Sequence, residues 1–153
     1  MYKHCDVSDE HISLHDCRAT EISYEGGVLS FGFPGGFWIL SGHECNASEK
    51  NLCTDSSEVR LYLGSEYDAT VYLYDEKFGR TIRRELSISD LMKLINHKKC
   101  ALEFLYPYKG YNSIIFECCL WTEKRPYHKE CELRLYLKKA EYLWNDLLSD
   151  REW

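Results

Sequence analysis

The sequence predicts an α+β fold: mainly an antiparallel sheet of about nine short strands, as a sandwich or a curled sheet, with one central and one C-terminal helix. Aromatic residues, which favour strands, make up 14% of the chain and include twelve Tyr. Apolar and polar residues alternate over many short runs, which is the period of a half-buried strand. Two segments have helical spacing instead. The length of 153 residues predicts one domain over residues 1–153.

The first strands are predicted as a meander. Residues 14–24 lead into the pair Gly26-Gly27, which suits the positive φ angles of a tight hairpin turn. The next run, 28–33, alternates cleanly between apolar and small or polar residues. Residues 37–40 are apolar on both sides of the chain, which is typical of a central strand.

Residues 42–56 have no period and are polar. A structureless stretch of this length is uncommon inside a compact domain and is usually a mobile or functional loop. We therefore expect a mobile rim here, beside the strands that follow it.

The clearest hairpin joins a run at 59–63 to a run at 70–74 through a turn at 64–66. A charged strand, 80–86, follows and is predicted at a sheet edge, where charge discourages the addition of further strands. Ser87 and Asp90 then fit the pattern of a helix N-cap, and apolar residues follow at helical spacing.

Three more strands are predicted, at 100–108, 113–121 and 131–138. In the first of them the alternation puts Tyr106 on the same side as Leu102 and Phe104. The period then changes, because apolar residues recur at intervals of three, four, seven and eight from Ala140. This spacing predicts an amphipathic helix at 139–149.

Composition excludes several function classes. The net charge of −6 repels a phosphate backbone unless the cations gather on one face, so nucleic acid is not an expected partner. The N-terminus lacks the basic and apolar regions of a secretory signal, and no apolar run is long enough for a membrane helix. We expect a cytoplasmic protein with no membrane partner, in which the eight Cys stay reduced.

Neither metal binding nor catalysis is predicted. Zinc needs four convergent ligands, usually as two close pairs, and no Cys-x-x-Cys occurs. The closest spacings are those of His43, Cys45 and Cys53, of His128 and Cys131, and of the neighbours Cys118 and Cys119. The pair His15-Asp16 is expected at the start of a strand, where adjacent side chains face opposite ways and cannot share an ion. We therefore predict no catalytic residue, no metal and no cofactor.

Tyrosine and arginine recur at the polar positions of the alternating strands. If the aliphatic positions face the core, the opposite face carries Arg60, Tyr62, Tyr72, Tyr74, Arg134 and Tyr136. Tyr and Arg are enriched at protein interfaces, so one interpretation is an exposed recognition surface. The other is that the two helices cover this face and make the tyrosines a second core layer.

The first quarter of the chain carries a short motif made of Leu14-His15-Asp16-Cys17, Ile22, Leu29 to Phe33 and Gly36 to Ile39. It resembles the opening of small uncharacterised bacterial proteins that start with a Leu-His-Asp strand and continue into a β-meander. Some of those proteins are similar to immunity proteins of polymorphic toxin systems. The resemblance implies a cytoplasmic binding protein without a catalytic site, and an acidic charge suits an inhibitor of a basic nuclease toxin.

The function predicted from these observations is binding of another protein, or of a second copy, through the Tyr and Arg face. An alternative is a curved sheet around a pocket for a small apolar or aromatic ligand, lined by Phe31, Phe33, Trp38 and Phe104. A hydrolase that uses His15, Asp16, His43 or Cys45 is a third interpretation.

Overall fold

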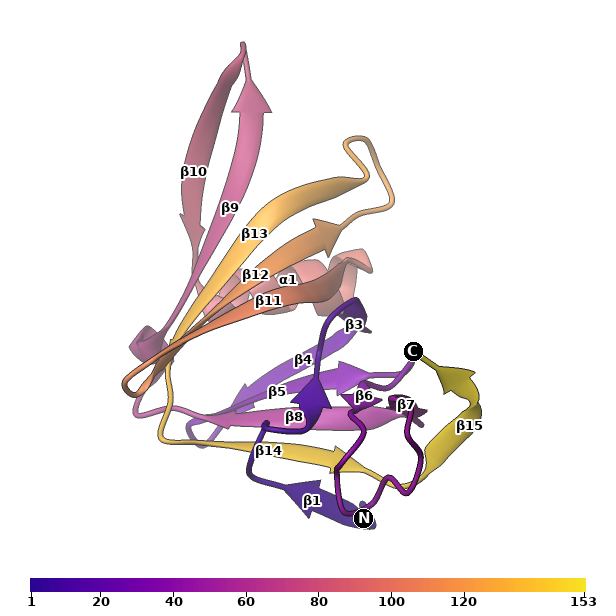
Figure 1. Cartoon of the computed structure of the whole chain (residues 1–153). Coiled ribbons are helices and arrows are strands. Elements are labelled where there is room, and N and C mark those ends of the chain that lie inside the picture. Colours follow the sequence, from indigo (N-terminus) through magenta and orange to yellow (C-terminus); the bar gives the residue numbers. More distant parts are fainter.

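The computed structural model describes all 153 residues and contains three antiparallel sheets and one α-helix (Figure 1). Sheet A has the order β1 (His4–Asp6), β14 (Lys139–Trp144), β8 (Ser57–Tyr62), β5 (Val28–Phe33) and β4 (Glu21–Glu25). Sheet C has the order β10 (Arg80–Leu86), β9 (Ala69–Lys77), β13 (His128–Tyr136), β12 (Ser113–Trp121), β11 (Ala101–Gly110) and β3 (Cys17–Ala19). Sheet B has the order β15 (Leu147–Glu152), β7 (Leu52–Thr54), β6 (Trp38–Ile39) and β2 (Ile12–Ser13).

The mainly antiparallel architecture is confirmed, but there are fifteen strands in three sheets where the sequence predicts about nine. The chain crosses directly between sheets A and C three times. The crossings are Thr20, between β3 and β4, residues 63–68, between β8 and β9, and residues 137–138, between β13 and β14. The second crossing contains a short 3-10 helix, η1 (Glu66–Asp68).

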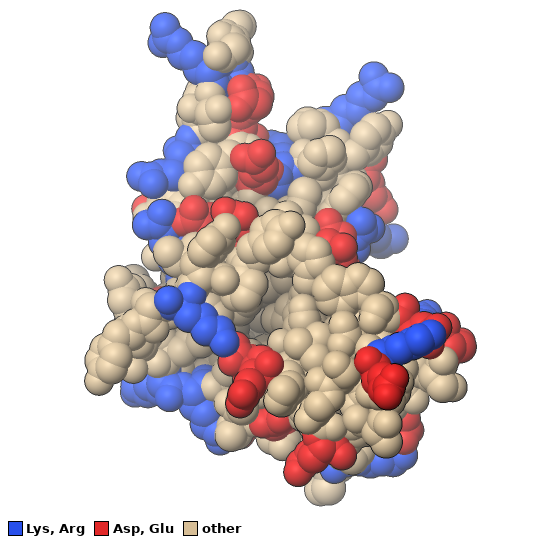
Figure 2. All heavy atoms as spheres, in the orientation of Figure 1, with Lys and Arg blue, Asp and Glu red and all other residues tan.

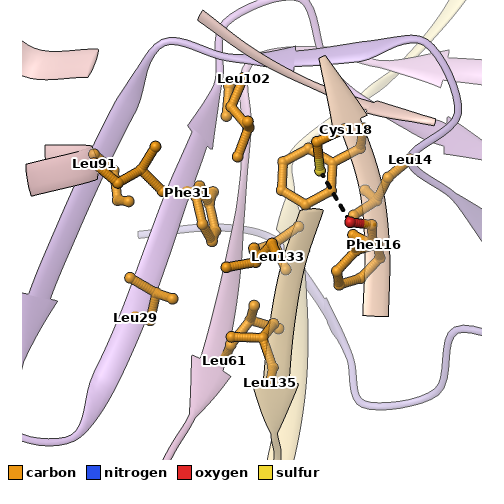
Figure 3. Close-up of a cluster of buried hydrophobic side chains, with 14 of the residues drawn as sticks. Leu14, Leu29, Phe31, Leu61, Leu91, Leu102, Phe116, Cys118, Leu133 and Leu135 are labelled. Atoms are coloured by element: carbon orange, nitrogen blue, oxygen red, sulfur yellow. Dashed lines mark hydrogen bonds between the residues drawn. The ribbon is translucent and has the colours of Figure 1, made fainter. Parts of the chain in front are cut away.

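Sheets A and C bury their facing sides in one cluster of 32 residues. Strands β5 and β8 contribute Leu29, Phe31 and Leu61, while β12 and β13 contribute Phe116 and Leu133 (Figure 3). The strict alternation of buried and part-exposed residues along β5, β8 and β12 is the predicted period of two. The buried positions of these strands therefore form the core.

Helix α1 (Ile88–Lys98) begins at the predicted cap, where the Ser87 side chain accepts a hydrogen bond from the Asp90 amide. It ends at Lys99, which takes the left-handed conformation with φ 52°. The helix lies against β4 and β9. Its buried residues, Ile88, Leu91 and Ile95, join the core cluster.

The predicted C-terminal helix at 139–149 is wrong, because this segment forms β14 and β15. Strand β14 fills the place between β1 and β8, where its backbone pairs on both sides. Ala140, Tyr142 and Trp144 pack against the core at a period of two. Tertiary pairing thus overrides a spacing that also fits a helix face.

The segment predicted as a mobile rim, 42–56, is anchored at several points. Residues 52–54 form β7, which pairs with β6 and β15. The buried Asn46 places its amide nitrogen 2.9 to 3.2 Å from the carbonyl oxygens of Ile39, Leu40 and Lys50. The irregular part of this segment is therefore shorter than predicted, and hydrogen bonds from one buried asparagine side chain connect its backbone.

Candidate functional site

The six predicted binding residues lie on two different sheets, so they form two surfaces and not one. Arg60 and Tyr62 are on β8 of sheet A, and the other four are on β9 and β13 of sheet C. In both sheets the residues between them point into the shared core. The two sets therefore face solvent on the outer sides of different sheets.

On sheet A, the polar groups of Arg60 and Tyr62 are already paired with neighbours. Arg60 Nε lies 2.7 Å from Glu58 Oε1, and the Tyr62 hydroxyl donates to Glu141 Oε2 at 2.7 Å. Lys139 binds the other oxygen of Glu141 at 2.5 Å and lies over the Tyr62 ring. Hydrogen bonds from Lys139 and Tyr62 lower the pKa of Glu141. These contacts are those of a cross-strand network.

On sheet C, two guanidinium groups lie over the ring of Tyr72. Arg83 of β10 lies 4.5 Å from the ring centroid and Arg134 of β13 lies 5.0 Å from it. Arg134 is also ion-paired with Glu132, whose second oxygen is 3.3 Å from the Tyr74 hydroxyl. Burial and then Glu132 raise the pKa of Tyr74 above its ordinary value of 10.

A β-bulge adds two tyrosines to this face that the alternation pattern misplaces. The register of β11 against β12 shifts between Phe104 and Tyr106, so that Tyr106 pairs with Glu117 and not with an inward-facing residue. The prediction that Tyr106 shares the side of Leu102 and Phe104 is therefore wrong. Tyr106 and Tyr108 are 54% and 53% exposed.

Pro107 is the signal in the sequence that could have revealed the bulge. Proline inside a strand is confined to edges and bulges because it has no N–H to donate. Strand β3 pairs with β11 only at residues 102–104, so Pro107 lies beyond its reach.

No element covers this side of sheet C. The single helix packs on the core side, through Leu91 and Ile95, and the second predicted helix does not exist. The interpretation in which helices bury the tyrosines is therefore wrong for this sheet, where Tyr136 is 65% exposed. We call this surface the outer face; its aromatic, aliphatic and cationic residues are Tyr72, Tyr74, Arg83, Tyr106, Tyr108, Ile115, Arg134 and Tyr136. Glu85, Glu117 and Glu132 lie on the same side.

His15 and Asp16 lie in the turn between β2 and β3, not at the start of a strand. Asp16 has φ 59°, and this turn lets His15 Nε2 approach Asp16 Oδ2 to 3.6 Å. His15 Nδ1 lies 2.8 Å from the carbonyl oxygen of Leu105, the residue at the bulge. The side chains therefore meet, contrary to the prediction, and His15 connects this turn to β11.

His43 and Cys45 do not form a catalytic chain. His43 Nδ1 accepts the Cys45 N–H at 3.1 Å, so its Nε2 carries the proton and donates to Asp6 Oδ2 at 2.9 Å. The Cys45 sulfur instead lies 3.6 Å from Nδ1 of a different ring, His4. Burial and then Glu44 raise the pKa of Cys45, which disfavours the nucleophilic thiolate. No group of three or more His, Cys, Asp or Glu side chains is placed to hold a metal ion.

The four aromatic residues predicted to line a ligand pocket do not do so together. Phe104 packs against Phe31 and Phe33 inside the core, with ring centroids 5.3 and 5.5 Å apart. Trp38 lies instead against Trp153, at 5.8 Å. A different pocket, of about 310 Å³, opens beside the bulge. Its apolar lining includes Phe104, Tyr106, Pro107, Phe116, Tyr142 and Trp153.

Comparison with known proteins found no matching family model, no matching curated protein and no matching solved structure. The helix of this protein is too short and too polar to cross a membrane. The outer face must therefore be interpreted from its own geometry.

Proposed function

We propose that the protein acts without catalysis, by binding another protein molecule through the outer face. The observation that supports this most is that the outer face is rich in Tyr and Arg and is not covered by a helix or strand. Tyr106, Tyr108 and Tyr136 keep more than half of their surface exposed, and no helix or strand packs over this side of sheet C. Tyr106 also contacts the ring of His15, from the turn between β2 and β3, at 5.1 Å between ring centroids. Tyr and Arg offer a large contact area with a polar end, which is why they dominate binding energy at interfaces.

The outer face is also well ordered before any partner arrives. Tyr72 is held between Arg83 and Arg134, and Arg134 is fixed further by Glu132. Immobilising a long side chain on binding costs about 0.5–1.5 kcal/mol. Side chains that neighbours already hold lose less freedom, so more of the contact energy contributes to affinity.

The test compares two double variants that differ only in the sheet they alter. Arg134→Glu with Tyr108→Ala changes the outer face, and Arg60→Glu with Tyr62→Ala changes sheet A. Both arginines pair with a glutamate two residues earlier, so the local disturbance is matched. Light scattering measures self-association, and quantitative mass spectrometry of proteins retained on the immobilised chain measures other partners.

We expect one protein, a second copy or another chain, to bind the wild type and the sheet A variant but not the outer-face variant. Equal retention by the two variants would place the interface elsewhere. A monomer that retains no protein in any form would reject the proposal.

A small apolar or aromatic ligand is a second candidate, supported by the pocket beside the bulge. A pocket of about 310 Å³ is at the lower end of the range for ligand sites, and most of its lining is apolar. A ligand of this kind should raise the unfolding temperature and change the fluorescence of Trp153. Trp153→Ala should remove both effects, and a full set of aromatic compounds without any effect would exclude this candidate.

A further inference from the structure

A pocket of about 650 Å³ lies between the C-terminal end of α1 and the loop at 122–127, which joins β12 to β13. In Figure 1 this loop is at the upper right, and Figure 2 shows cationic side chains extending from that region. The cations that line the pocket are Lys98, Lys99, Lys124, Arg125 and Lys129, and the only carboxylate is that of Glu123. The neutral ring of His97 also lines it. In a chain with a net charge of −6, the local charge here is reversed.

Four of these cations have no counter-charge. Lys98, Lys99, Lys124 and Arg125 are exposed, and none has a carboxylate oxygen within 4.0 Å. Only Lys129 is neutralised, by Asp75. Most other Lys and Arg of the protein do have an acidic partner. Unpaired like charges repel one another, so an acidic ligand would relieve this repulsion on binding.

The helix explains only part of the cluster. Lys98 and Lys99 lie at the C-terminal end of α1, where cations interact favourably with the negative end of the helix dipole. Lys124 and Arg125 belong to the loop at 122–127, but they line the same pocket as the helix end, so the dipole can favour them as well. The helix end carries a partial charge of only about −0.5, which is much smaller than the four positive charges gathered here.

Both walls of the pocket are fixed by hydrogen bonds. Thr122 donates its amide to the Tyr127 carbonyl at 2.8 Å, and its hydroxyl oxygen lies 2.7 Å from the Lys124 carbonyl. On the other wall, the amides of Lys99 and of the buried Cys100 both bond to the Leu94 carbonyl. The backbone that carries the four free cations is therefore ordered before a ligand arrives.

We propose that this pocket binds an Asp- and Glu-rich segment of another protein chain. The proposal does not depend on binding at the outer face. Charge complementarity is its main argument, and the volume suits a few residues of an extended segment. The lining contains no Phe, Tyr or Trp ring on which a nucleic acid base could stack, and its one aromatic ring is that of His97. The negative charge of the rest of the protein also disfavours a long polyphosphate chain.

The probe is a fluorescein-labelled peptide of glutamate residues, and its binding is followed by fluorescence anisotropy at low and high salt. Lys98→Glu with Lys124→Glu reverses two pocket charges. Lys138→Glu with Lys77→Glu is the matched control, because both exposed lysines also lack a carboxylate partner within 4.0 Å but lie outside the pocket. We expect the pocket variant to bind at least tenfold more weakly than the wild type, the control to stay within threefold, and salt to weaken all binding.

Three results would overturn the proposal: no binding at low salt, an equal loss in both variants, or tighter binding of a labelled oligothymidine that the pocket variant abolishes. The last result would make nucleic acid the ligand. If the pocket variant does not fold, amide NMR spectra of the wild type decide the question. The peptide should then shift the signals of residues 97–100 and 122–129, and shifts elsewhere would reject the pocket.

Discussion

Asn96 on α1 exchanges two hydrogen bonds with the backbone of Ile22 on β4. The Ile22 amide donates to Asn96 Oδ1 at 3.1 Å, and Asn96 Nδ2 donates to the Ile22 carbonyl at 2.7 Å. Strand β4 is the last strand of sheet A, so these backbone groups have no strand to pair with. A side-chain amide offers the same donor and acceptor as a peptide group, and here it occupies the place of the next strand.

Replacing Asn96 should therefore destabilise the protein. Asn96→Leu leaves the Ile22 amide and carbonyl unpaired beneath a larger apolar side chain, and we expect a loss of about 2 kcal/mol in the free energy of unfolding. Urea denaturation measures it. Lys93→Leu, an exposed position on the same helix, should change the free energy by no more than about 0.5 kcal/mol. Equal effects of the two substitutions would mean that the amide does not support β4.

Replacing Phe78 by asparagine, at the tip of the β9–β10 hairpin, should stabilise the protein. Phe78 and Gly79 join the paired residues Lys77 and Arg80, and both have positive φ, 51° and 69°. Such a turn favours Asn-Gly, and a bulky residue there is strained. Because the Phe78 side chain is fully exposed, Phe78→Asn removes strain without removing packing. We expect a gain of about 1 kcal/mol by urea denaturation.

Gly79→Ala provides the opposite test at the adjacent position. A Cβ at φ 69° is strained even though no atom lies within 4 Å of it. This variant should be less stable than the wild type. Stabilisation by Gly79→Ala, or destabilisation by Phe78→Asn, would show that the backbone of the turn differs from the one described.

Asp6 should make stability depend on pH in the acid range. Burial acts to raise its pKa, but hydrogen bonds from the Ser8 amide, His43 and the Val7 amide lower it below the ordinary value of 3.8. The contacts of the folded state stabilise the ionised form of the Asp6 carboxylate. The contribution of this group to the free energy of unfolding is therefore fully present above pH 3.8. It disappears as the pH falls through the lower pKa of the folded protein.

The stability difference between the wild type and Asp6→Asn should therefore shrink as the pH falls below 4. Chemical denaturation at each pH measures it. Asp150→Asn, an exposed carboxylate without an ion-pair partner, is the control and should show a much smaller change. A difference that grows on acidification would contradict the contacts of Asp6.

Thiol reactivity should separate the eight cysteines by burial. Burial raises the pKa of Cys17 and of Cys131 to about 12, and that of Cys118 well above its ordinary value. Cys5 is the only exposed cysteine, and because burial and then Glu141 raise its pKa too, access to the reagent and not acidity distinguishes it. At pH 8 we expect one fast-reacting thiol with Ellman's reagent, and eight after unfolding. A fast phase that survives in Cys5→Ser would show that another thiol opens readily to solvent.

Local patterns in the sequence were sufficient to predict much of the fold. The N-cap at Ser87, the period-two strands of the core and the edge position of β10 all depend on neighbouring residues, and all three are found in the structure. The C-terminal helix was wrong because residues 139–149 fit two periods. Only pairing with β1 and β8, which are far away in the chain, selects the strand.

The candidate site depended even more on long-range structure. Alternation correctly put Tyr72 and Arg134 on the solvent side of their strands, but it could not tell that β8 and β9 belong to different sheets. It also assumed an unbroken register, so one extra residue at the bulge was enough to misplace Tyr106. The basic pocket joins residues from a helix end and a distant loop, and no sequence period connects them.

The three crossings between sheets A and C affect how the protein unfolds. The shortest continuous fragment that contains all of sheet C, residues 17–136, also contains β4, β5 and β8 of sheet A, yet lacks the β14 that pairs with β8. Neither half could survive as a separate folding unit if the chain were cut. Amide protons at the centre of β8 and of β13 should consequently become exchangeable in the same opening event, with a single free energy for the whole molecule.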